Sequence, residues 1–234
     1  MAYRHPRNTN LSLHIDPVWQ GLPVNITRGP LIHEYLEGIH ASLQAAWHRH
    51  PRLLVVRADL HFPVQRRYMT RRVMIRFWEK FQRYIAADIH KRRSQGVRVH
   101  PCRPGYVWVR ENNQALNYHF HVAIFVNYNT YRSLGRFERW EGNLAARIRR
   151  AWALAIGLDP DEAQGLVHFP VNALHILDAR TANQAHQYSL VFYRLSYLAK
   201  VYSKEFGDGQ RNFGASRSGN SGGRCDSLQP PLIA

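Results

Sequence analysis

The segment 117–126, NYHFHVAIFV, constrains the fold more than any other part of the sequence, because it places two histidines inside an apolar run. Side chains on a β-strand alternate between the two faces of its sheet, so His119 and His121 project from one face. Ala123 follows on that face and leaves room for a ligand. The intervening residues point into a core on the other face: Phe120, Val122, Ile124 and Val126. We therefore predict a central strand with one apolar face and one histidine-bearing face.

The segments around this strand predict an α+β fold with a mainly antiparallel central sheet flanked by helices. Apolar residues at helical spacing indicate helices over 31–49, 67–93, 137–156 and 184–204. Apolar or alternating runs indicate further strands over 53–62, 105–111 and 165–169. The turn-prone residues 112–114 favour a hairpin between 105–111 and 117–126.

Composition divides the 234-residue chain into three parts. Residues 1–28 are polar and show no clear period, so we expect an arm that lies over the surface. Residues 29–206 are expected to form one domain that begins with a helix. Residues 207–234 are rich in Gly, Ser, Arg and Pro, which is typical of a flexible tail.

The charge of the chain indicates an anionic partner. Lys and Arg number 32 against 16 Asp and Glu, which gives a net charge of +16. Such a surplus repels itself unless a polyanion neutralises it, and nucleic acid is the first candidate, ahead of an anionic membrane surface. No apolar run approaches a membrane-spanning length, so no membrane partner is expected. The N-terminus has no apolar signal core, and the two cysteines, Cys102 and Cys225, form no CxxC motif. We therefore expect a cytoplasmic protein.

A carboxylate lies close enough in sequence to complete a metal site with the two histidines. Glu111 ends the strand before the predicted hairpin, eight residues before His119. Two imidazoles and one carboxylate bind a divalent metal and leave positions open for water or a phosphate oxygen. The alternative is a half-buried polar strand face, because the chain contains 14 histidines.

The last predicted helix carries a tyrosine and a lysine at helical spacing. Steps of three and four residues place one stripe on a single face: Leu190, Tyr193, Tyr197, Lys200 and Lys204. An adjacent apolar stripe should pack on the sheet: Val191, Leu195, Leu198 and Tyr202. An ammonium one turn from a phenol favours the phenolate and balances charge on a phosphate.

Only one of the two tyrosines on this stripe has a cation within one turn. Lys200 follows Tyr197 by three residues but follows Tyr193 by seven, which is about 10 Å along a helix axis. This spacing favours Tyr197 as a nucleophile. The alternative is that both are ordinary amphipathic tyrosines with solvated lysines nearby, since the chain has 12 tyrosines.

Taken in order, these motifs resemble the rolling-circle replication endonucleases of the HUH (His-hydrophobe-His) superfamily. The resemblance is nearest to filamentous-phage (inovirus) gene II-type replication proteins and to the YagK/YfjJ C-terminal domain family. It covers roughly residues 50–217, and the ordered set is more specific than the histidine pair alone. The segments that carry it are RADLHFP (57–63), YVWVRE (106–111), YHFHVAIFVN (118–127), GLVHFP (165–170), SYLAKVYSK (196–204) and RNFGASR (211–217).

The resemblance implies roles for individual residues. By motif position, His119 and His121 are ligands of Mg²⁺ or Mn²⁺, and Glu111 is a third ligand. Tyr197 is the nucleophile and Lys200 its cationic partner. Some members of the superfamily use a second tyrosine one turn away, a position that Tyr193 occupies here. Two residues of the first strand motif support the site or are simply a polar pair at a strand end: Asp59 and His61.

The activity that the resemblance implies is nicking of one DNA strand at a single-stranded or locally melted replication origin. The products are a 5′-phosphotyrosine link and a free 3′-hydroxyl. No Walker A motif is present, so a host helicase and a polymerase are expected partners. We expect Arg66, Arg67 and Lys204 to contact nucleic acid. The alternatives are a non-catalytic DNA-binding regulator of a mobile element, or a related transposase or relaxase.

Overall fold

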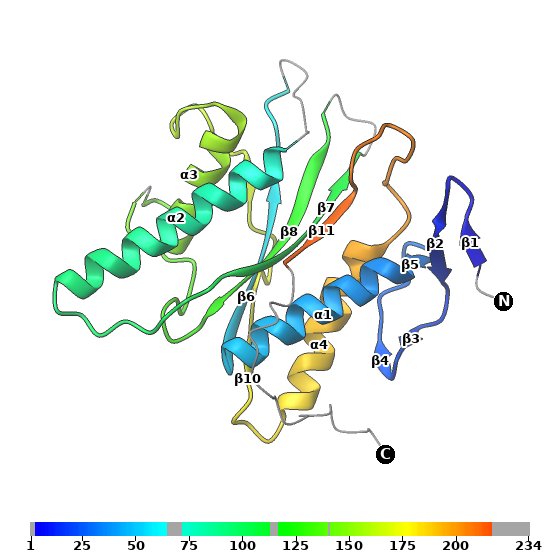
Figure 1. Ribbon diagram of the computed structural model, residues 1–234, viewed down its shortest axis with the longest axis horizontal. Helices are drawn as coiled ribbons and strands as arrows, with labels where there is room; N and C mark the ends of the chain where they lie inside the picture. The colour runs from blue at the N-terminus through cyan, green and yellow to red at the C-terminus, as the bar shows by residue number, and fades with distance from the viewer. Residues whose placement is uncertain (1–2, 65–71, 113–116, 140, 217–234) are drawn as a thin grey trace.

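The computed structural model describes residues 3–64, 72–112, 117–139 and 141–216, and it contains a central antiparallel sheet (Figure 1). The order of the strands across this sheet is β10-β6-β8-β7-β11, and β9 pairs with β6. All of these pairs are antiparallel. The bounds are β6 Arg52–Leu60, β7 Gly105–Glu111, β8 His119–Asn127, β9 Val167–His168, β10 Leu174–Asp178 and β11 Phe213–Ala215. The prediction of an α+β fold with a mainly antiparallel sheet is confirmed.

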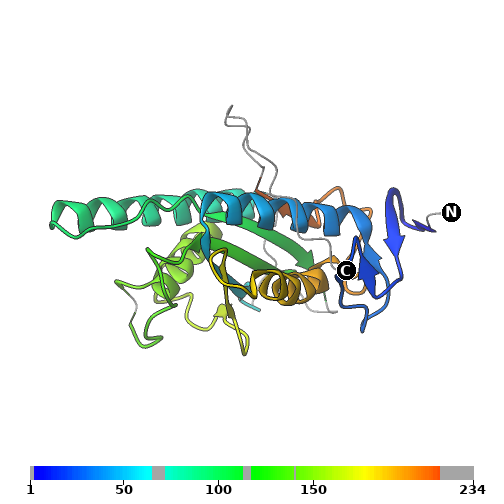
Figure 2. The ribbon, with the colours of Figure 1, turned by 90° about the horizontal axis from the view of Figure 1, so that it is seen from below.

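Among the described residues, two helices cover each face of the sheet. On one face lie α2 (Val73–Ser94) and α3 (Leu144–Ile156), and on the other lie α1 (His33–Arg49) and α4 (Gln184–Ser196). In Figure 1 the strands run between the pair α2 and α3 on one side and the pair α1 and α4 on the other, and in Figure 2 α1 and α2 lie above the strands while α3 and α4 lie below them. Within the described parts of the chain, no helix is both long and apolar enough to cross a bilayer.

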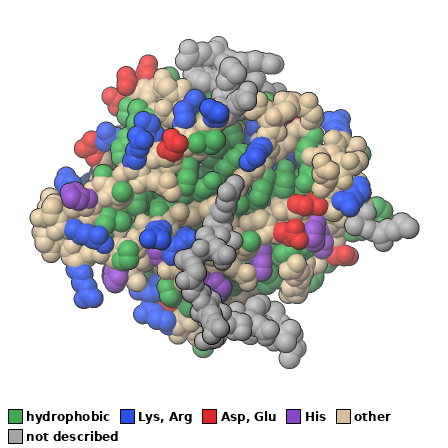
Figure 3. Space-filling model, in the orientation of Figure 1, with side chains coloured by type: hydrophobic (Ala, Val, Ile, Leu, Met, Phe, Trp, Pro, Cys, Tyr) green, Lys and Arg blue, Asp and Glu red, His purple; other side chains and the backbone are tan. Residues whose placement is uncertain are grey.

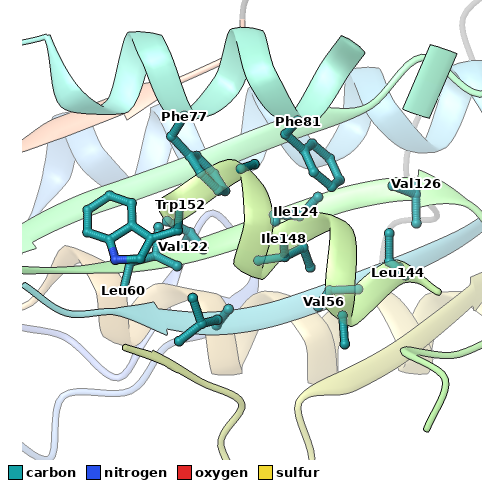
Figure 4. Packing of buried hydrophobic residues seen from close by; sticks show 14 of the residues in the cluster. Val56, Leu60, Phe77, Phe81, Val122, Ile124, Val126, Leu144, Ile148 and Trp152 are labelled. Carbon is teal, nitrogen blue, oxygen red and sulfur yellow. The ribbon is translucent and has the colours of Figure 1, made fainter. Parts of the chain in front are cut away.

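The alternation along β8 separates two hydrophobic cores. Phe120, Val122, Ile124 and Val126 pack with α2 and α3, as the sequence predicted. Phe77 and Phe81 of α2 and Trp152 of α3 contribute rings to this core (Figure 4). Ala123 and Phe125 point the other way and pack with α1 and α4. Strand β8 is therefore buried on both faces over most of its length, and this fixes the side on which its histidines project.

The N-terminal segment is not the surface arm that its composition predicted. Strands β1 (Tyr3–His5), β2 (Asn8–His14) and β5 (Leu31–Ile32) form a three-stranded sheet, and β3 (Val18–Trp19) pairs with β4 (Leu22–Pro23). Long-range contacts explain the difference. Two apolar side chains of this segment, Trp19 and Val24, are buried in the core of α1 and α4.

The chain after α4 also differs from the prediction of one helix followed by a flexible tail. The α-helix ends at Ser196, a 3₁₀ turn covers Tyr197–Ala199, and Lys200 leaves it with an extended ψ of 141°. Strand β11 then pairs with β7, so residues 207–216 belong to the fold. Strand β10 was not predicted, and α3 begins later than the sequence indicated. Residues 67–71, with which the sequence began the second helix, lie outside the described residues.

Candidate active site

Four of the predicted site residues lie on one face at the same end of the central sheet. Residues directly opposite each other in neighbouring antiparallel strands share a face. Glu111 of β7 is opposite His119 of β8, and Asp59 of β6 is opposite His121 of β8. The two-residue period places both histidines on that face. The predicted hairpin geometry is therefore confirmed, and it brings the carboxylates of two flanking strands to the histidines of the central one.

The side chains of Glu111, His119 and His121 converge closely enough to hold a metal ion. Their nearest ligand atoms all lie within 4.8 Å of one another. The two Nε2 atoms are 3.2 Å apart, and His121 Nε2 is 3.3 Å from Glu111 Oε2. Neighbouring ligands in an octahedral site with bonds of roughly 2.1 Å are about 3 Å apart. The donor set and its spacing thus fit a divalent cation that prefers nitrogen and oxygen ligands.

Asp59 orients His121 from behind this group. The Nδ1 atom of His121 lies 2.5 Å from Asp59 Oδ1. Asp59 accepts a hydrogen bond from Nδ1 when that atom carries the proton, and the Nε2 lone pair then faces the other two ligands. Carboxylates commonly support metal-binding histidines in this way. Burial opposes ionisation of Asp59, but the hydrogen bond with His121 and the nearby charges lower its pKa to about 2. Asp59 is therefore an anion at neutral pH and acts as a positioning residue.

The two histidines have opposite electrostatic environments. Burial and the neighbouring His121 and His61 lower the pKa of His119 to about 4, so His119 is neutral at pH 7. Burial also opposes protonation of His121, but its hydrogen bonds to Asp59 and Glu111 outweigh that effect and raise its pKa. The ring of His61 stacks on that of His119, with centroids 5.3 Å apart and planes 11° from parallel.

Glu111 is the centre of a buried charge cluster that the sequence did not predict. Lys200 Nζ lies 2.7 Å from both carboxylate oxygens, Lys204 Nζ lies 3.1 Å from Oε1, and Ser203 Oγ donates to Oε2 at 2.7 Å. Burial opposes ionisation of Glu111, but His121 and the two ammonium groups hold its pKa well below the usual range. A carboxylate offers about four lone-pair positions, so Glu111 as a metal ligand must share its oxygens with two lysines.

Lys200 links this cluster to the predicted nucleophile. Its Nζ lies over the ring of Tyr197, 4.0 Å from the ring centroid, and Tyr197 is half-buried. The prediction of one continuous helix with Lys200 and Tyr197 on a shared stripe is wrong, because the helix ends before Lys200. The 3₁₀ turn still brings the ammonium to the phenol ring, where a cation–π contact is favourable.

The other predicted residues are not gathered at this site. Tyr193 is half-buried one turn earlier in α4, and within the described ranges no ring contact or ion pair joins it to the Glu111 cluster. Lys204 was expected to contact nucleic acid, but its side chain is fully buried and donates to the carbonyl of Lys200. Arg66 and Arg67 lie outside the described residues.

Two polar residues near Asp59 were missed as individual site residues, although both lie in motifs that the sequence singled out. Arg57 Nη2 is 3.6 Å from Asp59 Oδ1, and His168 Nδ1 is 3.6 Å from Asp59 Oδ2. The Nε atom of Arg57 is buried and makes no hydrogen bond. The two-residue period of β6 could have found Arg57, because it places Arg57 and Asp59 on one face.

Comparison with known proteins gives this chain a family. The model of the YagK/YfjJ C-terminal domain matches residues 16–216. The uncharacterized protein YagK of Escherichia coli strain K12 is 34% identical over 200 residues, which cover 82% of this chain and 96% of that protein. The uncharacterized protein YfjJ of the same strain is 29% identical over 194 residues, or 78% and 93% of the two chains. No solved structure matches. This chain therefore belongs to the YagK/YfjJ C-terminal domain family.

Proposed function

We propose that this protein is a DNA-nicking strand transferase that initiates rolling-circle replication, with Tyr197 as its nucleophile. One observation carries the proposal. A continuous series of contacts joins the tyrosine to the histidine pair, from Tyr197 through Lys200 and Glu111 to His121. This series of contacts supports a single site for the predicted nucleophile and the predicted metal ligands, although Tyr197 and His119 are 78 positions apart in the chain.

The chemistry assigned to this site is an in-line displacement at phosphorus. The phenol oxygen of Tyr197 attacks a phosphodiester, the new O–P bond forms, and the bond from phosphorus to the 3′ oxygen breaks. The phenol proton passes to solvent, and the leaving 3′ oxygen takes up a proton. The protein stays joined to the 5′-phosphate, and a later hydroxyl can reverse the exchange because the phosphotyrosine is an activated ester.

The charged residues around Tyr197 support this reaction. The Lys200 ammonium lies over the Tyr197 ring, 4.0 Å from its centroid, where it would stabilise the negative charge of a phosphate bound beside the tyrosine. Glu111 holds that ammonium in place through two contacts of 2.7 Å. His119, His121 and Glu111 are the residues that would hold Mg²⁺ or Mn²⁺, which supplies Lewis-acid polarisation of the scissile phosphate.

A second candidate is a DNA-binding regulator that lacks nuclease activity. It is favoured by the contacts of Glu111, whose carboxylate is bound by Lys200, Lys204 and Ser203 as a structural counter-ion would be. A transposase or a relaxase would use the same tyrosine chemistry as a replication initiator. Those roles differ only in the DNA that is cut, so the substrate used in the assay distinguishes them.

The experiment is an adduct assay on supercoiled and single-stranded circles that carry the DNA flanking this gene. We expect Mn²⁺ or Mg²⁺ to produce nicked circles and a protein–DNA band that survives denaturing detergent. Tyr197→Phe removes only the hydroxyl, so the band should disappear while DNA affinity is retained. Tyr193→Phe, one turn earlier in α4, is the matched control and should still form the adduct. Intact DNA with every metal tested, together with normal DNA binding, would support the regulator instead.

A further inference from the structure

A groove runs along the opposite side of β7 from the histidines. It consists of two hollows, and Tyr106 lines both of them. Their volumes are about 690 and about 520 Å³. Their walls come from α2, from the edge formed by β7 and β11, and from the end of α1. Figure 3 shows hydrophobic side chains gathered in the middle of this side of the molecule, with Lys and Arg side chains and some acidic ones around them.

Three aromatic side chains form the floor of the groove. Tyr106 and Trp108 project from β7, and Trp78 projects from α2, with the rings of Trp78 and Tyr106 4.2 Å apart. All three are partly exposed. A Cβ atom at Gly214 would lie 2.5 Å from the Trp108 indole, so the absence of a side chain there lets the indole lie flat against β11. These rings offer flat surfaces of the size on which nucleic-acid bases stack.

The charged residues that line the groove all have the same sign. None of the described residues that line its two hollows is an aspartate or a glutamate. The lining contains five arginines. One of them, Arg110, is buried, and the other four are exposed: Arg49, Arg72, Arg103 and Arg211. An apolar floor alone would also suit a peptide, but aromatic rings between arginines favour a ligand with flat bases on a negatively charged backbone.

We propose that this groove binds single-stranded nucleic acid. Bases stack on Trp78, Tyr106 and Trp108, and the phosphates pair with the four exposed arginines. Stacking on these rings requires unpaired bases, because the bases of a duplex already stack on each other. Trp108 is opposite Val122 in the sheet, on the face away from the histidines. The groove is thus separate from the candidate active site, and binding there depends on neither a metal nor strand cleavage.

The test measures the affinity for a fluorescein-labelled oligothymidylate by anisotropy, in EDTA, so that the result is independent of nicking. The double substitution Arg72→Gln with Arg211→Gln should weaken binding at least about tenfold at low salt. It should also reduce the slope of log affinity against log salt by about 1.4, since each phosphate contact to a single strand contributes about 0.7. The matched control, Arg7→Gln with Arg28→Gln, removes two exposed arginines outside the groove and should cause a much smaller change.

A second variant tests the stacking surface. Trp108→Leu should weaken binding about tenfold, because loss of one base–aromatic stack costs roughly that much, while the salt slope stays the same. The arginine pair keeps the proposal testable if this variant fails to fold. If the groove double variant and the control double variant bind the oligothymidylate with equal affinity, the proposal is overturned, and the groove would bind another partner such as a peptide. A loss of binding that follows only from deletion of residues 217–234 would also overturn the proposal.

Discussion

Arg110 and Glu111 are neighbours on β7, and each is a charged residue that is 1% exposed, yet they occupy different kinds of buried site. Arg110 points to the face of α2 and α3. Its guanidinium pairs with Asp208 at 2.7 Å and donates to Asn212 Oδ1 at 2.8 and 3.0 Å. It also lies 4.2 Å from the ring centroid of Tyr118. Glu111 points to the other face, toward the histidines and two lysines.

The balance of charge distinguishes the two sites. Arg110 meets one close carboxylate, that of Asp208, so its charge is neutralised within the protein. Among the described residues, two carboxylates around Glu111 and Asp59 face three cations: Lys200, Lys204 and Arg57. This excess of positive charge suits a site that takes a phosphate together with the metal ion. We infer that the Arg110 cluster fastens the C-terminal segment to the sheet, whereas the Glu111 cluster is built for a ligand.

The largest expected effect comes from removing the charge of Glu111. Glu111→Gln leaves the ammonium groups of Lys200 and Lys204, which are 4% and 0% exposed, without their anion. Breaking a buried ion pair from one side costs about 3–5 kcal/mol, so urea denaturation should show a loss of that size. Adding Lys204→Met should recover part of it, because one uncompensated charge is then removed. An unchanged free energy of unfolding would show that the cluster is not electrostatically coupled.

A smaller loss is expected from the Arg110 site. Arg110→Met should lower the free energy of unfolding by about 1.5–3 kcal/mol, the range for hydrogen bonds to charged groups. Asp208 is 32% exposed and can be solvated after the substitution, which limits the cost. Mn²⁺ affinity, measured by calorimetry, should not change. A weakened Mn²⁺ affinity would contradict the separation of the two sites.

Asp59→Asn should act chiefly on metal binding, with a smaller loss of stability because Arg57 loses the carboxylate 3.6 Å from it. The asparagine amide has the size of the carboxylate but carries no charge. The His121 ring therefore loses the anion that accepts the hydrogen bond from its Nδ1–H. Loss of such a supporting partner lowers metal affinity by about 10- to 100-fold. The control is His90→Ala, which removes an exposed histidine on α2. Equal Mn²⁺ affinities for Asp59→Asn and His90→Ala would remove Asp59 from the site.

The histidine face could be predicted because it depends on short-range regularities. The two-residue period of β8 assigned Phe120 to the core and His121 to the site, and a hairpin between adjacent strands brought Glu111 to His119. Both arguments need only residues that are close in sequence. They are independent of how the helices pack, and for that reason the structure agrees with them.

The position of Lys200 could not be predicted, because contacts distant in sequence determine it. The residues YLAK contain no helix breaker, so periodicity alone extends α4 through them. In the structure the backbone of Lys200 bridges to Leu31, and its ammonium pairs with Glu111, 89 residues away. Similarly, residues 207–216 look flexible by composition, but Asp208 and Asn212 are held by Arg110.

The central claim, that Tyr197 and the histidine pair form one nicking site, is tested most directly by locating the covalent link. The wild-type protein is incubated with Mn²⁺ and single-stranded DNA from the region flanking its gene, the DNA is digested, and the peptides are analysed by mass spectrometry. We predict a nucleotide attached to the peptide that contains Tyr197, and none on any peptide when His119 and His121 are both replaced by alanine. A nucleotide on Tyr193 instead, or an adduct that persists without the histidines, would contradict the account.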